Sequence, residues 1–248
     1  MSNGFIVCRP VGCYLGNATM TYLFCRAHAE RVGAELQCDH WIGERIFNVP
    51  HNPVTVEGLP TLKTRDMKGD ETNVQVRCYA MNEKAMIYTK RQAQSWLTFR
   101  PECVDWCENY FGKHPSLLGG HWAHWRRMDF APLSFPLVSM ASYLKAHAPF
   151  GPDSDLNFTS WEAPMKSDEI PAELFMLLDF YALCKASLLF RANSSFSWLA
   201  GLLSNERVFS PIMTGCTGGV DNECEFIEGN WPSIAPWYFE CSDMHISP

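Results

Sequence analysis

The chain has 248 residues, of which 47% are hydrophobic and 19% charged, enough to bury one large core or two smaller ones. The formal net charge is −7 and the basic residues form no long run, which argues against nucleic acid as a partner. Eleven cysteines scattered from Cys8 to Cys241, with no secretory signal, indicate a soluble protein of the reducing cytoplasm.

The N-terminus predicts a strand, a glycine turn and a helix. Residues 5–8 form a short apolar run, and Asn17 is a suitable N-cap for a helix that Gly33 ends. This order is the first half of a Rossmann-like unit. The glycines at Gly12 and Gly16 allow either a close backbone approach to a ligand or an ordinary tight turn.

The next part of the chain alternates extended segments and loops before two helices. The predicted segments are extended residues 36–42, a loop over 49–70, a strand over 74–78 and helices over 88–98 and 102–111. Gly112 to Pro115 then break the helical pattern, so we place a domain boundary there, between residues 1–115 and 116–248. Cys103 and Cys107 lie one helical turn apart near His114, but without an obvious fourth ligand we expect no structural metal.

A dense polar cluster follows the predicted strand over residues 117–125. It contains His124, the adjacent Arg126 and Arg127, and Asp129. A guanidinium presents a fork of donors that matches phosphate oxygens two at a time, so the arginine pair suits a diphosphate. The alternative is that these arginines only form ion pairs between structural elements.

Residues 135–147 are predicted to form an amphipathic helix. A Gly/Pro turn that contains Asp153 and Asp155 follows this helix. The two carboxylates are either a metal-binding pair or a solvated turn. After a strand over 156–161, a helix over 172–185 carries Asp179 within an apolar sequence. Because Asp179 and Lys185 interrupt the apolar window over 174–190, we expect no stable membrane span.

A strand over residues 187–190 leads into a helix that runs to about residue 203. Asn193, Ser194, Ser195 and Phe196 occupy the turn between them. Hydroxyls and backbone amides at a helix start can bind phosphate, and the alternative is simple N-capping by Ser194 or Ser195. A further strand is expected over residues 208–211.

Three of these turns resemble motifs of the alpha-1,2-fucosyltransferase family and its wider fucosyltransferase relatives. The first resembles that family's Gly-x-x-Leu-Gly-Asn turn and helix, and the second its His-x-Arg-Arg-x-Asp motif. The third is similar to its C-terminal segment. The matching residues are Gly12 to Asn17 with Tyr22, Phe24, Arg26 and Ala27; His124 to Asp129; and Asp179 to Lys185 with Asn193 to Trp198.

The resemblance implies an α/β fold of the GT-B type, in which two Rossmann-like domains face each other across a cleft. The C-terminal domain would bind GDP-fucose as donor substrate, and the N-terminal domain would contact a glycan acceptor. Transfer would invert the anomeric centre and need neither a metal nor another cofactor. A non-catalytic nucleotide- or glycan-binding module of the same fold, and a transferase for another sugar nucleotide, are the alternatives.

The resemblance also assigns roles to individual residues. Arg126 would hold the diphosphate, with Arg127 supporting it or pairing with Asp129. Asp129 is a candidate catalytic base or an orienting partner of an arginine. The remaining expected contacts are Asn193, Ser194, Ser195 and Phe196 around the diphosphate and base, His124 and Asp179 at guanine, and Gly16 and Asn17 near the reacting sugar. For Asp179 the alternatives are a solvent-facing position or a pair with Lys185.

Overall fold

The structure is a computed structural model that describes residues 4–10, 15–78, 80, 85–126, 136–159 and 175–230. By its internal contacts the chain divides into two compact units; among these residues the first ends at Arg100 and the second begins at Pro101. Helix α4 (Pro101–Gly112) therefore belongs to the second unit, whereas the predicted boundary near residue 115 placed it in the first. Within the described ranges, no helix has the length and apolar character to cross a membrane.

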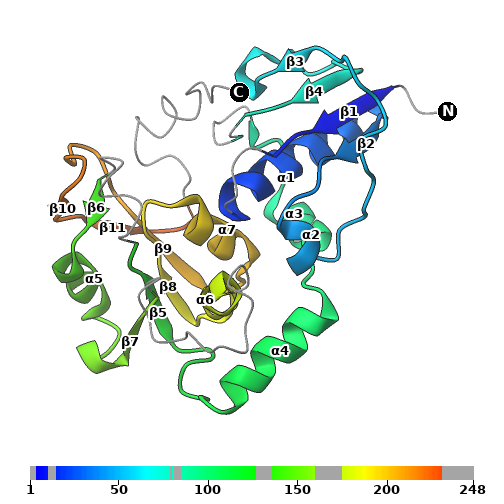
Figure 1. The fold of residues 1–248 in the computed structure, drawn as a ribbon. Coiled ribbons are helices and arrows are strands. Elements are labelled where there is room, and N and C mark those ends of the chain that lie inside the picture. Colours follow the sequence, from blue (N-terminus) through cyan, green and yellow to red (C-terminus); the bar gives the residue numbers. More distant parts are fainter. Residues whose placement is uncertain are drawn as a thin grey trace. The chain divides into compact units, whose positions relative to one another are not determined.

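The first unit is built on a four-stranded sheet whose strands are all parallel, in the order β2-β1-β4-β3 (Figure 1). Helix α1 (Leu15–Val32) connects β1 to β2, as parallel neighbours require a crossover. Gly33 follows this helix with a φ of 68°, as the sequence predicted. The strands are β1 (Phe5–Cys8), β2 (Glu35–Cys38), β3 (Thr61–Leu62) and β4 (Val74–Val76).

Helix α1 begins at Leu15, so the prediction that Asn17 caps it was wrong. Asn17 instead lies in the first turn and is partly exposed. Leu15 is buried, and its carbonyl oxygen accepts a hydrogen bond from the Thr19 hydroxyl at 2.7 Å. The earlier start follows from this burial, because a leucine in the core stabilises more than a polar cap does.

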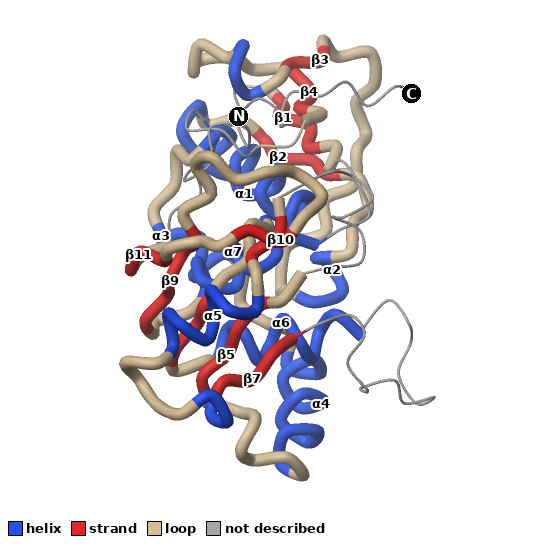
Figure 2. Tube along the Cα trace, turned by 90° about the vertical axis from the view of Figure 1, so that its left-hand side faces the viewer, coloured by secondary structure: helices blue, strands red, loops and turns tan. Residues whose placement is uncertain are grey.

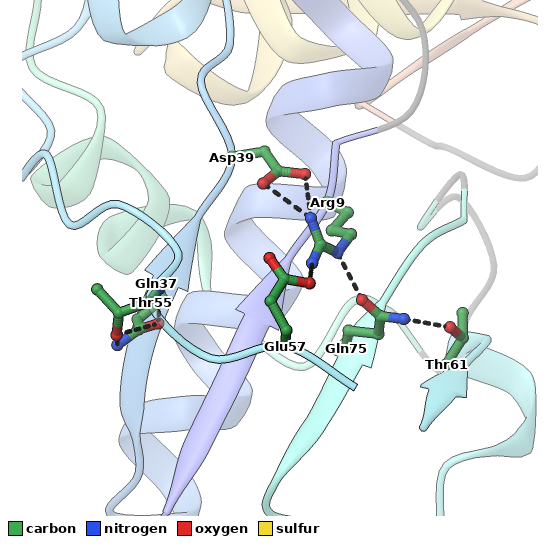
Figure 3. Close-up of polar contacts among 7 residues, drawn as sticks. All are labelled: Arg9, Gln37, Asp39, Thr55, Glu57, Thr61 and Gln75. Atoms are coloured by element: carbon green, nitrogen blue, oxygen red, sulfur yellow. Dashed lines mark hydrogen bonds and ion pairs between the residues drawn. The ribbon is translucent and has the colours of Figure 1, made fainter. Parts of the chain in front are cut away.

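An arginine just past β1 contacts polar side chains of the neighbouring chain segments in the first unit (Figure 3). Arg9 follows β1, and its Nη1 donates to both oxygens of Asp39, at 3.0 and 2.9 Å, just past β2. Its Nε donates to Gln75 Oε1 of β4 at 2.5 Å, and its Nη2 donates to Glu57 at 3.3 Å. The donors of this guanidinium are thus directed at protein acceptors.

Short helical segments complete the first unit. Thr89 and Gln92 form a reciprocal capping box at the start of α3. Residues 36–42, predicted to be extended throughout, leave the strand after Cys38, because Trp41 turns inward and stacks on Tyr22 at 5.0 Å. The segments are α2 (Gly43–Ile46), the 3-10 turn η1 (Thr64–Asp66) and α3 (Lys90–Trp96).

The second unit contains a five-stranded sheet in the order β11-β9-β8-β5-β7. All neighbours in it are parallel except β11, which is antiparallel to β9. Strands β5 and β7 can be followed side by side in Figure 2. The strands are β5 (His121–His124), β7 (Leu156–Thr159), β8 (Leu188–Phe190), β9 (Arg207–Pro211) and β11 (Phe226–Glu228).

Residues 136–147, predicted as part of one helix, form a strand and a shorter helix. Strand β6 (Leu137–Val138) pairs in parallel with β10 (Asp221–Asn222), a partner far along the chain. Ser139 then caps α5 (Met140–His147) by accepting the Ser142 N–H at 3.2 Å. The helical prediction failed because it did not include this non-local pairing or the strong cap at Ser139.

Helices cover both faces of the second sheet. Ala123 of β5 is in register with Phe158 of β7, so the two share a face, and Tyr143 of α5 packs on Phe158 with ring centroids 6.0 Å apart. His124 points to the opposite face, where it packs 5.4 Å from Phe196. Phe196 lies at the start of α7 (Ser195–Leu203), which packs beside α6 (Phe175–Lys185). Such two-sided covering is typical of doubly wound α/β sheets.

Candidate functional site

The carboxyl ends of β5, β7 and β8 meet at one edge of the second sheet, since these strands are parallel neighbours. Parallel α/β sheets bind their ligands outside such an edge. The strands end at His124, Thr159 and Phe190. Arg126 follows the first of them and Ser194 follows the third, so the edge brings together two of the predicted motifs.

Arg126 and Ser194 are in direct contact, although they are 68 positions apart in the sequence. Arg126 Nη1 donates to Ser194 Oγ at 2.8 Å. The same oxygen accepts the Phe196 N–H at 3.2 Å, which confirms Ser194 as the N-cap of α7. A guanidinium and the first N–H groups of a nine-residue helix therefore lie together, and both favour an anion.

A narrow depression without room for a water molecule lies beside Arg126. Residues that follow β5 and β8 line it together with β6 and α5, and Asn193, one of the predicted donor contacts, is among them. The lining consists of Arg126, Pro136, Leu137, Val138, Tyr143, Ala192 and Asn193.

His124 is buried beneath this edge, with 6% of its surface exposed. Its carbonyl oxygen accepts the Tyr143 hydroxyl at 2.9 Å. Burial lowers the pKa of the His124 imidazole well below its ordinary value, and the guanidinium groups of Arg126 and Arg191 lower it further. The imidazole is therefore neutral at pH 7 and retains an acceptor nitrogen.

Three buried polar atoms at the same edge have no hydrogen-bond partner among the described residues. They are His124 Nδ1, Thr159 Oγ1 and Asn193 Nδ2. Buried polar groups are almost always paired, and an unpaired one is costly. Together these atoms, at the carboxyl edge of a parallel sheet, are candidate contacts for a ligand or for water.

Arg191 is a residue of this edge that the sequence reading did not single out. It follows β8 directly, and its Nη1 donates to Ser210 Oγ at 3.0 Å and to Asn230 Oδ1 at 2.8 Å. The side chain is thereby fixed, with 4% of the residue exposed. Its place directly after a buried strand was the available signal. Its role in the described contacts is to hold β9 and the end of β11 while adding positive charge near His124.

Asp179 lies in α6 close to the start of α7, because its neighbour Phe180 packs on Phe196 with ring centroids 5.2 Å apart. The carboxyl group is half-buried, and none of the described hydrogen bonds or ion pairs includes it. Burial raises the pKa of the Asp179 carboxyl to about 7. Pairing with Lys185 was the considered alternative; among the described side chains no ion pair joins the two residues, and Lys185 Nζ lies 5.4 Å from the centre of the Tyr181 ring.

The remaining predicted residues are distributed as follows. Ser195 is buried in the first turn of α7 beside Ser194. Gly16 and Asn17 belong to the first unit, in the first turn of α1. Arg127 and Asp129 lie outside the described residues, so their predicted roles have no structural counterpart here.

The metal-binding alternatives raised by the sequence can be placed as well. Asp153 and Asp155 form the exposed 3-10 turn η3 (Asp153–Asp155) immediately before β7, which agrees with the solvated-turn interpretation. Cys103 and Cys107 are buried, whereas His114 is exposed. Neither set is among the described side chains whose donor atoms converge on one point.

No protein-family model matches the chain, and no curated protein sequence matches it either. Solved structures do match. The alpha-1,6-fucosyltransferase NodZ co-crystallized with GDP has a TM-score of 0.57 at 16% identity, covering 93% of this chain and 100% of that chain. NodZ soaked with GDP-fucose has a TM-score of 0.53 at 13% identity, covering 91% and 99%. Other structures of this fucosyltransferase name Bradyrhizobium as its source.

A plant fucosyltransferase also shares the fold. FUT1 of Arabidopsis thaliana in complex with GDP has a TM-score of 0.51 at 12% identity, covering 87% of this chain and 74% of that chain. At these identities the likeness concerns the fold. The chain therefore has the α/β fold of these fucosyltransferases, with parallel sheets and covering helices, and the predicted fold class is confirmed.

Proposed function

We propose that this chain is a glycosyltransferase that moves fucose from GDP-fucose to a hydroxyl group of a glycan acceptor. The observation that carries the proposal is the contact between Arg126 and the N-cap Ser194 at the carboxyl edge of a parallel sheet. The fold is shared with fucosyltransferases whose structures contain GDP or GDP-fucose. The sequence motifs that resemble that group of enzymes contribute these same two residues.

In this proposal Arg126 binds the diphosphate, and the amide groups at the start of α7 add to its field. Negative charge develops on the diphosphate as the anomeric bond breaks, so fixed cations and amides stabilise the transition state more than the ground state. Ser194 orients the guanidinium through their 2.8 Å hydrogen bond. Ser195 lines the same helix start, and Arg127 supports Arg126 or pairs with Asp129.

The guanine base would be recognised at the carboxyl edge of the second sheet, on the side of α6. Guanine offers an N–H and an amino group side by side, which one carboxylate can accept together, whereas uracil offers a single N–H between two carbonyls. Asp179 is the proposed reader, since its half-buried carboxyl group makes no described hydrogen bond and so has acceptor oxygens available for the base. Phe196 would stack on the base, and His124 and Asn193 would supply further polar contacts.

The proposed reaction is a single displacement at the anomeric carbon. The acceptor oxygen forms its bond as the bond to the diphosphate breaks, which inverts the configuration, and the acceptor proton passes to a base. Asp129 is the candidate base. Gly16 and Asn17, at the start of an 18-residue helix, would lie near the reacting sugar. Arginine and helix amides would supply the positive charge, so transfer in EDTA should match transfer with magnesium or manganese.

Two measurements test the proposal. Thermal shifts with GDP, UDP, ADP and their sugars report which nucleotide binds the folded chain, because a ligand of the folded state raises its apparent stability. A transfer assay with GDP-fucose and a panel of oligosaccharides then reports turnover through GDP release. We expect GDP and GDP-fucose to give the largest shifts and GDP release to depend on acceptor. If GDP binds but no fucose is transferred, the chain is a nucleotide-binding module and not an enzyme. If the chain prefers UDP-sugars, the assignment of GDP-fucose as donor is contradicted.

A further inference from the structure

A separate group of polar side chains converges in the first unit. His40, Glu44 and His51 each direct one donor atom to a common point, with these atoms all within 4.8 Å of one another. His40 Nδ1 lies 2.5 Å from Glu44 Oε2, and His51 Nδ1 lies 3.4 Å from the same oxygen. The two imidazole rings meet edge to face, with centroids 5.8 Å apart. One oxygen is thus approached by two imidazole nitrogens.

The Glu44 carboxylate is the unusual member of this group. Its side chain is only 8% exposed, whereas the side chains of His40 and His51 are 77% and 59% exposed. Its Oε2 atom is buried and has no hydrogen-bond partner among the described residues, because the nearby imidazole nitrogens do not meet hydrogen-bond geometry. A buried carboxylate oxygen without a hydrogen bond is costly, and a cation at this point would remove the cost.

The backbone that carries the three residues is held by its packing. Trp41 is buried against Tyr22, and Gly43 packs so closely on the Trp41 ring that an added Cβ would lie 2.1 Å from it. The turn from His40 to Glu44 is therefore fixed. On the other side, the Cys38 N–H donates to the Asn52 carbonyl oxygen at 2.9 Å, which anchors the chain next to His51.

From this geometry we propose that His40, Glu44 and His51 bind a zinc ion or a chemically similar divalent transition metal. Two imidazole nitrogens and one carboxylate oxygen form a ligand set that zinc accepts, with the fourth position open to water. Tetrahedral bonds of about 2.0–2.1 Å place neighbouring ligand atoms roughly 3.3–3.4 Å apart. The separation of His51 Nδ1 from Glu44 Oε2 already has this value, at 3.4 Å.

His40 must move slightly to join such an ion. Its 2.5 Å separation from Glu44 Oε2 is too short for two ligands of one metal. Since the side chain is 77% exposed, a small rotation meets little resistance. Magnesium and calcium prefer oxygen ligands, so this nitrogen-rich set selects against them.

The ion would connect the chain around His51 to the turn between β2 and α2. Residues 48–60 contain no helix or strand, so this cross-link would stabilise a segment that otherwise depends on scattered hydrogen bonds. A metal that binds only the folded chain raises its melting temperature by mass action. The site does not take part in the proposed sugar transfer, so its test is independent of that proposal.

The experiment is a calorimetric titration of Zn²⁺ into tag-free chain kept reduced with a phosphine reductant. We expect one ion per chain for the wild type, at least tenfold weaker binding for His51→Ala, and still weaker binding for the His40→Ala/His51→Ala double variant. His114→Ala removes an exposed histidine of the second unit and is the matched control, which should bind zinc like the wild type. Mg²⁺ should give no binding at the same concentrations.

The chain's many cysteines make a second readout necessary, and X-ray absorption of the wild-type zinc complex provides it without any variant. A first shell of nitrogen and oxygen with the outer scattering of histidine supports the site. Sulfur ligands, absence of stoichiometric binding, or equal zinc affinity in the wild type and the double variant would each overturn it. Because His40 and His51 are exposed, both variants should retain the wild-type circular dichroism and the metal-free melting temperature.

Discussion

Each of the two sheets carries an arginine just beyond the carboxyl end of a parallel strand, but the two side chains have different surroundings. Arg9, after β1, directs its fork at Asp39, Glu57 and Gln75. Arg126, after β5, donates to the hydroxyl that caps helix α7. The first guanidinium is surrounded by negative charge, and the second lies where a helix adds positive potential.

From this difference we infer that two arginines in equivalent positions of the fold have different roles. In the first unit, the carboxylates of Asp39 and Glu57 compensate the charge, so the side chain acts as a cross-link. In the second unit, the helix start adds to the charge, which favours binding of an anion from outside. Four substitutions test whether this contrast is real.

Arg126→Ala should have the largest effect. Loss of a charge-assisted contact to the leaving diphosphate should cost about 2–4 kcal/mol in transition-state stabilisation, roughly a 30- to 1,000-fold loss of kcat/KM. Arg126→Lys should recover little, since it keeps the charge without the fork. Steady-state kinetics with GDP-fucose measures both variants. A folded Arg126→Ala protein of near-normal activity would remove this residue from the proposed mechanism.

Asp179→Asn should weaken GDP binding by about 1–3 kcal/mol, because an acceptor for guanine becomes a donor and leaves a polar group unpaired. UDP binding should change little. Calorimetric titration of both nucleotides measures this, with the exposed Asp105→Asn in α4 as the matched control. If Asp179→Asn and Asp105→Asn bind GDP alike, Asp179 does not read the base.

The same carboxyl predicts a dependence on pH. Its pKa rises from 3.8 to about 7 on folding, so between these values the folded chain holds a proton that the unfolded chain has released. The contribution of Asp179 to stability therefore falls as pH rises from about 4 to about 7 and is constant above that. Urea denaturation from pH 5 to pH 8 should show a smaller decline for Asp179→Asn than for the wild type.

Arg9→Ala should destabilise the chain without affecting nucleotide binding. Removing its contacts leaves Asp39 and Gln75 without their shared donor, and a loss of about 1–2 kcal/mol is expected for this partly exposed cluster. Urea denaturation and GDP titration on the same preparation separate the two effects. Reduced GDP affinity in a folded Arg9→Ala protein would show that the first sheet also serves the nucleotide.

The smallest expected effect comes from Ser194→Ala, which tests whether the Ser194 hydroxyl only caps helix α7 or also serves nucleotide binding. Ser194→Ala and Ser139→Ala each remove a serine N-cap in the second unit and should each cost about 1 kcal/mol of stability. Only Ser194 also receives the Arg126 guanidinium. GDP affinity should therefore fall in Ser194→Ala and stay unchanged in Ser139→Ala, and parallel titrations would reveal an equal change in both as a purely structural role.

Local signals predicted the regular elements well. The apolar runs that became β1, β8 and β9 were found, as was the helix start at Ser194, because burial and capping act over a few neighbouring residues. The strand at Leu137–Val138 was missed, since its partner Asp221–Asn222 is distant in the chain. Its two residues carry no periodic pattern of their own.

The candidate site shows the same limit. The motifs indicated that Arg126 and Ser194 serve one ligand, but their 2.8 Å contact depends on the pairing of β5 with β8. The fixed position of Arg191 depends on Ser210 and Asn230, which no local pattern connects to it. The His40, Glu44 and His51 cluster needed the fold in the same way, because its spacing matches no familiar metal-binding motif.

The double use of the Ser194 hydroxyl restricts how this chain can change in length. The oxygen that starts α7 also positions the guanidinium, so the short connection between Phe190 and Ser195 sets both at once. If a residue inserted or deleted there were taken up by the helix, the capping position would shift by about 1.5 Å along the axis and by roughly 100° around it. Related sequences should therefore vary freely in the length of other loops while keeping this connection constant.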